Sequence, residues 1–274
     1  MIKILFCDLD GTLLLNGDNH SGRVSNENIK AIKKLEENGI KFGIATSRSN
    51  KFIYKQMECE HEIDTVAFNG NLVTCDHKIL SNVSFTYDEL LMISRMLKVE
   101  EDNRHMFITI DNDVLFYDLN YKRVQGYIKN ELNYVQDHNI ILNENFYDYL
   151  KEHYHKICFI IGVFPNKEIA DKAREELKLL ESIQYVDTSE RTCTFTKNNI
   201  DKVTGILEIA NYYGIKEDEI AVIGDSYNDL KMIQTFKHSF CMSHGPESIK
   251  KESRYIVNHV HECIEMILKM NEMA

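Results

Sequence analysis

Acidic residues stand in two short groups far apart in this 274-residue chain. Asp8 and Asp10 flank a single residue, and Asp225 and Asp229 lie one helical turn apart. If the fold brings these groups into one cleft, a pair of carboxylates at ~4 Å repels by roughly 4 kcal/mol at an effective dielectric constant of ~20. A cation is then required among them. Mg²⁺ is the natural candidate, because it binds hard oxygen ligands and keeps several waters.

With a metal in place, such a group of side chains could transfer a phosphoryl group. One carboxylate can act as the nucleophile, while a neighbour moves the proton of the leaving group and later that of the attacking water. Lys202 would neutralise the charge that gathers on the phosphoryl group. The hydroxyl of Thr46, with nearby backbone amides, would hold its oxygens.

Three apolar runs end at these chemical groups and are expected to be buried strands. They are residues 2–7 before Asp8, residues 40–45 before Thr46 and residues 220–223 before Gly224-Asp225. Open sheets of parallel strands bind ligands at the carboxyl ends of their strands. The runs therefore predict that the candidate residues meet along one edge of a sheet.

A helix between the first two runs would complete a strand-helix-strand unit. Ser25 can cap its start, Ile29, Ile32 and Leu35 share one face, and Gly39 follows its end. This spacing predicts a parallel sheet. Since the same alternation returns after residue 200, we expect an α/β fold whose core is a Rossmann-like, doubly wound parallel sheet.

The middle of the chain predicts a second kind of domain. Apolar runs at residues 106–110 and 114–117 flank Asp111-Asn112-Asp113, a turn signal that favours an antiparallel hairpin. We therefore expect an inserted α+β cap domain. The predicted boundaries are a catalytic core made of residues 1–84 and 188–274, and a cap domain at residues 85–187.

The acidic groups belong to motifs that resemble those of the haloacid dehalogenase superfamily. In chain order these are Asp8-Leu9-Asp10-Gly11-Thr12, Thr46, Lys202 and Gly224-Asp225-Ser226-Tyr227-Asn228-Asp229. The first and fourth motifs together are highly specific, and the match spans essentially the whole chain. The second acid, Asp10, favours phosphatases over the dehalogenases, which lack it.

The resemblance implies a role for each motif residue. By this resemblance, Asp8 is the nucleophile that forms an aspartyl-phosphate, and Asp10 is the acid and base. Thr46 is a phosphate ligand, and Lys202 stabilises the charge. The implied Mg²⁺ site consists of the Asp8 side chain, the Asp10 carbonyl and Asp225, with Asp229 supporting the metal from close by.

The chain is similar in particular to the Cof-like subfamily, whose members carry a large α/β cap of class IIB. This likeness rests on an insert after Thr46, on Asn69-Gly70 and on Ile-Asp-Lys-Val-Thr-Gly at residues 200–205. It implies hydrolysis of small phosphate monoesters such as sugar phosphates, flavin mononucleotide or pyridoxal phosphate. Two departures lie near the family's active-site rim. Residues 242–245 read Met-Ser-His-Gly instead of Met-Gly-Asn-Ala, and residues 257–261 lack the usual Asp-Gly.

Further residues are candidates for contact with the substrate, namely Ser47, Arg48, Asn69, Gly70 and Asn228. Arg48 could pair with a substrate anion or merely with an acidic neighbour at the surface. Asn69-Gly70 could contact the substrate, but the simplest role of this pair is to form a tight turn. By resemblance, Asn228 would help to position Lys202 or the phosphate.

Composition argues against several other classes of protein. A formal net charge of −11 without a basic stripe is unlike a nucleic-acid-binding protein. No apolar run has the length of a membrane span or the form of a signal peptide, and the seven scattered cysteines do not resemble a disulfide framework. We expect a cytoplasmic protein whose partner is a small-molecule phosphate monoester, with no nucleic acid or membrane partner and an oligomeric state left open.

Two other functions fit part of the pattern. A sugar phosphomutase of the same superfamily would form an isomeric sugar phosphate without releasing phosphate. A phospho-signalling module or a non-catalytic phosphometabolite sensor would bind a phosphoester without turnover, although receiver modules are far shorter than this chain. The Cof-like pattern favours hydrolysis.

Overall fold

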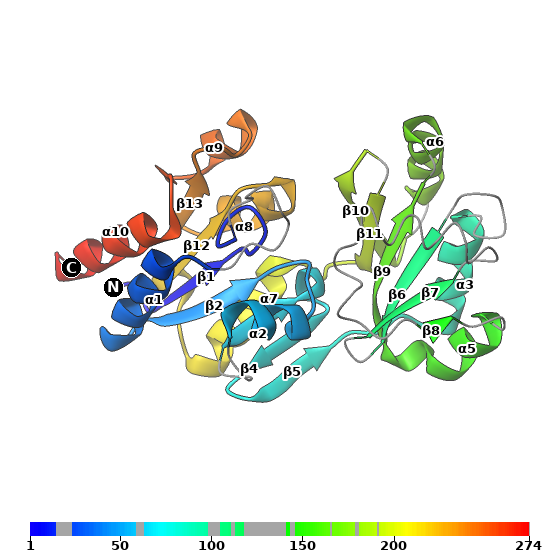
Figure 1. Cartoon of the computed structure of the whole chain (residues 1–274), viewed down its shortest axis with the longest axis horizontal. Coiled ribbons are helices and arrows are strands. Elements are labelled where there is room, and N and C mark those ends of the chain that lie inside the picture. Colours follow the sequence, from blue (N-terminus) through cyan, green and yellow to red (C-terminus); the bar gives the residue numbers. More distant parts are fainter. Residues whose placement is uncertain are drawn as a thin grey trace. The chain divides into compact units, whose positions relative to one another are not determined.

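The chain folds into two compact units, as the computed structural model shows (Figure 1). The first unit comprises Met1–Ser81 and Ile200–Ala274, and the second comprises Asn82–Asn199. The structure describes residues 1–14, 24–58, 63–97, 105–110, 113–117, 141–142, 146–164, 166–178, 181–190 and 192–273.

An eight-stranded sheet forms the centre of the first unit, in the order β14-β13-β12-β1-β2-β3-β4-β5. The strands are β1 (Ile4–Cys7), β2 (Lys41–Ala45), β3 (Asp64–Ala67), β4 (Leu72–Cys75), β5 (Lys78–Asn82), β12 (Ile220–Gly224), β13 (His238–Met242) and β14 (Tyr255–Val257). All described neighbours from β14 to β3 pair in parallel, whereas β4 runs antiparallel to β3. The predicted α/β class with a mainly parallel sheet is confirmed.

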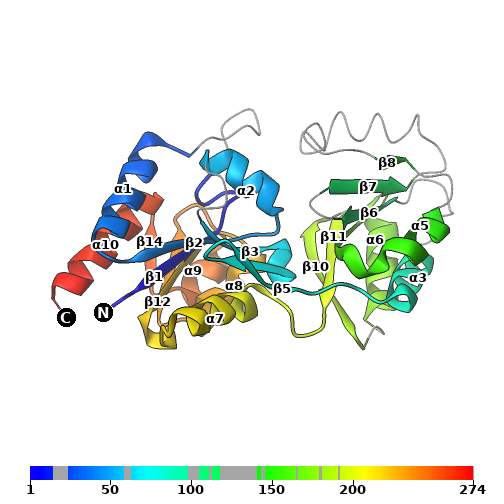
Figure 2. The same ribbon diagram turned by 90° about the horizontal axis from the view of Figure 1, so that it is seen from below.

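Helices cover both faces of this sheet (Figure 2). One face carries α1 (Asn26–Glu37) and α10 (Val260–Glu272), which pack against each other, and the other face carries α7 (Lys202–Tyr213) and α8 (Leu230–Thr235). Two shorter helices, α2 (Asn50–Met57) and α9 (Glu247–Glu252), complete the unit. A sheet covered on both sides explains why its strands read as continuous apolar runs.

The first helix follows its predicted signals with one exception. Ser25 caps α1 by accepting the backbone N–H of Asn28, and Gly39 follows the helix with a φ of +74°. The predicted apolar face is only partly buried, because Ile32 and Leu35 are buried whereas Ile29 is 38% exposed. Asn28 is buried there instead, since its Oδ1 accepts the backbone N–H of His261 at the start of α10.

The second unit is built on a six-stranded sheet in the order β10-β11-β9-β6-β7-β8. Its strands are β6 (His105–Ile110), β7 (Asp113–Tyr117), β8 (Ile141–Leu142), β9 (Ile157–Val163), β10 (Ile183–Ser189) and β11 (Thr192–Lys197), and its helices are α3 (Tyr87–Met96), α5 (Phe146–His153) and α6 (Lys167–Leu177). The antiparallel pairing of β6 with β7 agrees with the predicted hairpin, whose turn residues 111–112 lie outside the described residues. Because β11 pairs with β9, this unit continues beyond residue 187, where the sequence placed the end of the cap domain.

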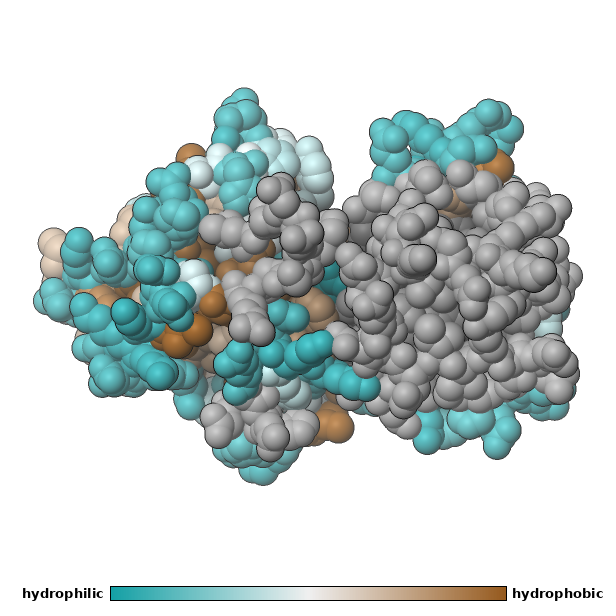
Figure 3. Space-filling view, in the orientation of Figure 1, coloured by the Kyte–Doolittle hydropathy of each residue, from teal (hydrophilic) through white to brown (hydrophobic). Residues whose placement is uncertain are grey.

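The described helices are all too short or too polar to cross a membrane. On the face of the first unit seen in Figure 3, hydrophobic residues stand in small groups among hydrophilic ones. The chain ends of this unit are joined, since Asn271 on α10 accepts the backbone N–H of Ile2 and donates to its carbonyl (Figure 1).

Candidate active site

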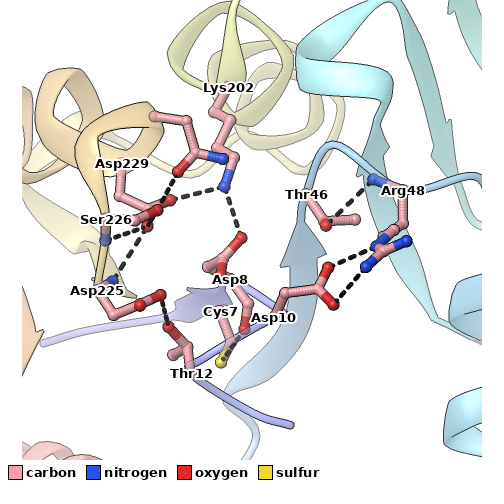
Figure 4. A network of polar contacts seen from close by, with 11 residues as sticks. Cys7, Asp8, Asp10, Thr12, Thr46, Arg48, Lys202, Asp225, Ser226 and Asp229 are labelled. Atoms are coloured by element: carbon pink, nitrogen blue, oxygen red, sulfur yellow. Dashed lines mark hydrogen bonds and ion pairs between the residues drawn. The ribbon is translucent and has the colours of Figure 1, made fainter. Parts of the chain in front are cut away.

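Three parallel strands deliver the candidate residues to the same edge of the first unit's sheet. Asp8 follows β1, Thr46 follows β2 and Asp225 follows β12. The register explains their closeness, because Cys7 pairs with both Ile44 and Ile223. The predicted sheet edge therefore exists, and the side chains on it face one another (Figure 4).

A buried lysine joins two of the acidic side chains at this edge. The Nζ of Lys202, at the start of α7, lies 2.6 Å from Oδ1 of Asp8 and 2.6 Å from Oδ1 of Asp229. All three side chains are at least 96% buried. Burial alone disfavours the ammonium form, but the two carboxylates outweigh it and raise the pKa of Lys202. The side chain is thus held as a cation inside the site.

Asp225 extends this pair into a group of three carboxylates. One ligand oxygen from each of Asp8, Asp225 and Asp229 lies within 4.8 Å of the others. Burial and the charge of Asp229 raise the pKa of Asp8 and also that of Asp225. When all are ionised, three carboxylates and one ammonium leave an excess of two negative charges in this group, which a divalent cation would balance.

The donor set suits Mg²⁺ in chemistry as well as in charge. Every candidate ligand atom is a hard oxygen, and Asp225 is only partly buried, which leaves room for metal-bound water. The hydroxyl of Thr12 donates to Oδ1 of Asp225 at 3.0 Å and so orients this carboxylate. Gly11, with a φ of +85°, lets the loop pass close by, because a Cβ there would lie 2.5 Å from Oδ2 of Asp225.

Asp229 organises the loop between β12 and α8. Its Oδ2 accepts the backbone N–H groups of Asp225 and Ser226, each at 3.0 Å, while Oδ1 accepts from Lys202. Gly224 is required beside it, since a Cβ would lie 2.5 Å from the Asp229 carboxyl carbon. These bonds give Asp229 a supporting position next to the other two carboxylates.

Arg48 contacts the second acid of the first motif directly. Its Nε and one terminal nitrogen donate to the two carboxylate oxygens of Asp10, at 2.7 and 2.9 Å, and Figure 4 shows the Asp10 carboxylate turned toward them. The Arg48 guanidinium also lies over the ring of Phe52 at 4.9 Å. Of the two predicted roles for Arg48, the structure shows the pairing with an acidic neighbour.

The remaining candidates lie around Thr46 and the start of α7. Thr46 is buried, accepts the backbone N–H of Arg48 through its hydroxyl and accepts that of Asn69 through its carbonyl. Gly70, with a φ of +103°, packs directly on the backbone of Asp201, the capping residue of α7. The Asn69-Gly70 turn therefore connects Thr46 to the helix that carries Lys202.

The side chains of Asn69, Asn228 and Ser47 lie outside the group of carboxylates and Lys202. The side-chain amide of Asn69 is buried, and it has no hydrogen-bond partner among the residues that the structure describes. Asn228 is half-buried and accepts the hydroxyl of Ser226 at 2.5 Å, and Ser47 is half-buried after β2. Direct contact of Ser47, Asn69 and Asn228 with a substrate stays a prediction.

Two residues that lie near Asp225, Thr12 and His244, had no role predicted from the sequence. Thr12 closes the first motif, so its position two residues after Asp10 could have pointed to the candidate metal site. His244 lies with its Nε2 3.7 Å from Oδ2 of Asp225. The only signal for it was the departure of residues 242–245 from the Cof-like pattern.

Comparison with known proteins shows the family to which this chain belongs. A family model described as haloacid dehalogenase-like hydrolase matches residues 5–265. The 5-amino-6-(5-phospho-D-ribitylamino)uracil phosphatase YcsE of Bacillus subtilis is 22% identical over 257 residues, which cover 94% of this chain and 90% of that protein. A second phosphatase with the same activity in its name, YwtE of Bacillus subtilis, is 24% identical, with coverage of 93% and 92%.

Solved structures share the fold. A haloacid dehalogenase-like hydrolase from Bacteroides thetaiotaomicron has a TM-score of 0.80 at 19% identity, covering 97% of this chain and 100% of that one. A sugar phosphatase of HAD subclass IIB has a TM-score of 0.78 at 17% identity, with coverage of 97% and 98%. The resemblance predicted from the acidic motifs is confirmed.

Proposed function

Because the chain belongs to the haloacid dehalogenase-like hydrolases, we propose that it is a Mg²⁺-dependent phosphatase of small phosphorylated metabolites that works through an aspartyl-phosphate on Asp8. One observation carries this proposal. The buried ammonium of Lys202 bridges Asp8 and Asp229 beside Asp225, at the carboxyl end of the central strands. A nucleophile, a fixed positive charge and an oxygen-rich metal site thus occur together.

In the first step, a carboxylate oxygen of Asp8 attacks phosphorus, and the bond from phosphorus to the leaving oxygen breaks. Asp10 must first leave its position against Arg48 and take up a proton from solvent, and it then donates this proton to the leaving oxygen. Lys202 and the Thr46 hydroxyl stabilise the charge on the phosphoryl oxygens. Asp8 is buried at 3% exposure, so its immediate surroundings contain little water to compete with the attack.

In the second step, water attacks the phosphorus of the aspartyl-phosphate and Asp10 takes its proton. The bond between phosphorus and the Asp8 oxygen breaks, which releases phosphate and restores the carboxylate. Asp8, the Asp10 carbonyl and Asp225 would hold Mg²⁺, with Asp229 in support. When bound, the ion neutralises charge on the carboxylates and on the phosphoryl group.

The substrate class follows from the relatives rather than from a described contact. We propose a phosphate monoester of the sugar phosphate, flavin mononucleotide or pyridoxal phosphate type, in line with the phosphoribityl and sugar phosphatases named above. We also propose a cytoplasmic location. The described cysteines Cys7, Cys75, Cys158, Cys193, Cys241 and Cys263 are buried thiols, which suits a reducing compartment.

Release of inorganic phosphate from a panel of these esters tests the proposal, with Mg²⁺ or EDTA and with wild type and Asp8→Asn. We expect Mg²⁺-dependent release that falls by at least about a thousandfold in Asp8→Asn. Asp148→Asn, which changes an exposed carboxylate on α5, serves as the control and should keep full activity. Formation of an isomeric sugar phosphate without release would point instead to a mutase, and binding without turnover to a sensor.

A further inference from the structure

His244 lies in a turn that the structure holds in place between β13 and α9. The backbone N–H of Ser243 donates to the carbonyl of Val257 at 2.8 Å, and that of Gly245 donates to the carbonyl of Met242 at 2.9 Å. The ammonium of Lys250 binds the carbonyl of Ser243 at 3.1 Å. The backbone position of His244 is therefore fixed by hydrogen bonds of Ser243 before it and of Gly245 after it.

This turn packs directly on Asp225. A Cβ on Gly245 would lie 2.8 Å from the backbone oxygen of Asp225, so only glycine allows the close approach. The imidazole Nε2 of His244 then lies 3.7 Å from Oδ2 of Asp225, while Thr12 binds the other oxygen. His244 thus faces the carboxylate oxygen that Thr12 leaves open.

An imidazole at this place changes the chemistry of the metal site. Mg²⁺ strongly prefers oxygen ligands, whereas divalent transition ions also bind a site with a nitrogen ligand, with an affinity that rises from Mn²⁺ to Co²⁺. The His244 side chain is 48% exposed and stands outside the group of three carboxylates. Because it is half-exposed, its ring can turn toward a bound ion without disturbing the core.

On the premise of the metal site described under the proposed function, we propose that His244 supplies a nitrogen ligand to that site. It thereby raises the affinity for Mn²⁺ and Co²⁺ relative to Mg²⁺. His244→Asn replaces the imidazole by a smaller side chain with an amide oxygen, so the site of this variant holds oxygen ligands in place of the nitrogen.

Calorimetric titration of the metal-free protein with Mn²⁺ and with Mg²⁺ tests the affinity. We expect His244→Asn to weaken Mn²⁺ binding about tenfold and to leave Mg²⁺ binding within about twofold. His238→Asn is the matched control, because His238 begins β13 and so lies at the opposite end of the same strand. Equal changes for the two ions, or no change for either, would overturn the proposal.

A spectroscopic measurement checks the ligand itself. Electron spin echo modulation of protein-bound Mn²⁺ should show ¹⁴N coupling in wild type and in His238→Asn, and none in His244→Asn. Bound Mn²⁺ without ¹⁴N coupling in wild type would refute the role of His244 and leave the phosphatase proposal standing. Failure of wild type to bind either ion would overturn both.

Discussion

Lys202 is the residue on which the electrostatics of the site depend. Its ammonium compensates two buried carboxylates, and its removal would leave them close together without a counter-charge. Breaking a buried ion pair by removing one partner costs far more than breaking a surface pair. We expect Lys202→Met to lower the free energy of unfolding by about 3 kcal/mol and kcat by about a hundredfold or more.

Urea denaturation and phosphate release measure these two effects. Lys231→Met is a suitable control, because Lys231 pairs with Asp201 at the surface of the same unit and is 66% exposed. Such surface pairs contribute little to stability. Similar losses of unfolding free energy and of kcat in the two variants would contradict the conclusion that the electrostatics of the site depend on Lys202.

Single residues of the site differ in how far the sequence could predict them. Asp8 and Asp225 were predictable, because their motifs place carboxylates directly after buried strands and because the chemistry needs such groups there. For Arg48 the alternatives were a substrate anion and an acidic surface neighbour, and Asp10 was not predicted as its partner, since this pairing depends on how β1 and β2 lie side by side. The contact of His244 with Asp225 depends on a turn beyond β13, which no periodic pattern specifies.

At the scale of elements, strands and helices that bury a face were the predictable part. The run before Asp8 reads as a buried strand, and all four residues of β1 are buried. Hydrophobicity grouped Ile29 with Ile32 and Leu35 on α1, but it could not show that buried Asn28 serves as an acceptor for α10. Periodicity reports burial, but it does not report polar contacts between elements.

The turn after β3 ties two elements of the site together through Gly70. Its φ is +103°, and a Cβ would lie 2.2 Å from the backbone oxygen of Asp201 at the start of α7. Gly70→Ala must therefore separate the turn from the helix that carries Lys202. We expect a loss of more than about 2 kcal/mol in the free energy of unfolding, together with a fall in kcat.

Gly39→Ala separates the steric effect from the backbone effect. Gly39 also has a positive φ, +74°, but open space surrounds its missing Cβ. This variant should lose only about 1 kcal/mol and retain its kcat. Equal stability and activity of the two variants would show that the contact between the turn and α7 does not matter.

At the scale of the molecule, segments far apart in the chain form one candidate metal site. Asp8 and Lys202 are 194 positions apart, with the whole second unit between them in sequence. The sequence could predict this meeting, because parallel strands with the same polarity bring their carboxyl ends to one edge. The exact extent of the second unit was harder to predict, since β11 continues an antiparallel sheet without a clear change in composition.

The stability of the whole protein should depend on Mg²⁺ and pH together. Burial and the charge of Asp229 raise the pKa of Asp8 and of Asp225, so the metal-free folded state holds protons that the unfolded chain releases at lower pH. The metal-free protein therefore loses this part of its stability as the pH rises above the ordinary range of carboxyl groups. Ionisation of the same groups creates the proposed Mg²⁺ site. Mg²⁺ should thus stabilise the protein more at about pH 8 than at about pH 5.

Thermal unfolding with and without saturating Mg²⁺ measures this coupling. We expect Mg²⁺ to raise Tm by about 5 °C at about pH 8 and by much less at about pH 5. In Asp225→Asn, which removes one negative charge from the group of three, the Tm shift at the higher pH should largely disappear. A shift that is equal at both pH values, or that persists in Asp225→Asn, would mean that Mg²⁺ stabilises the protein elsewhere, because only ionised carboxylates at this edge of the sheet can account for the expected pattern.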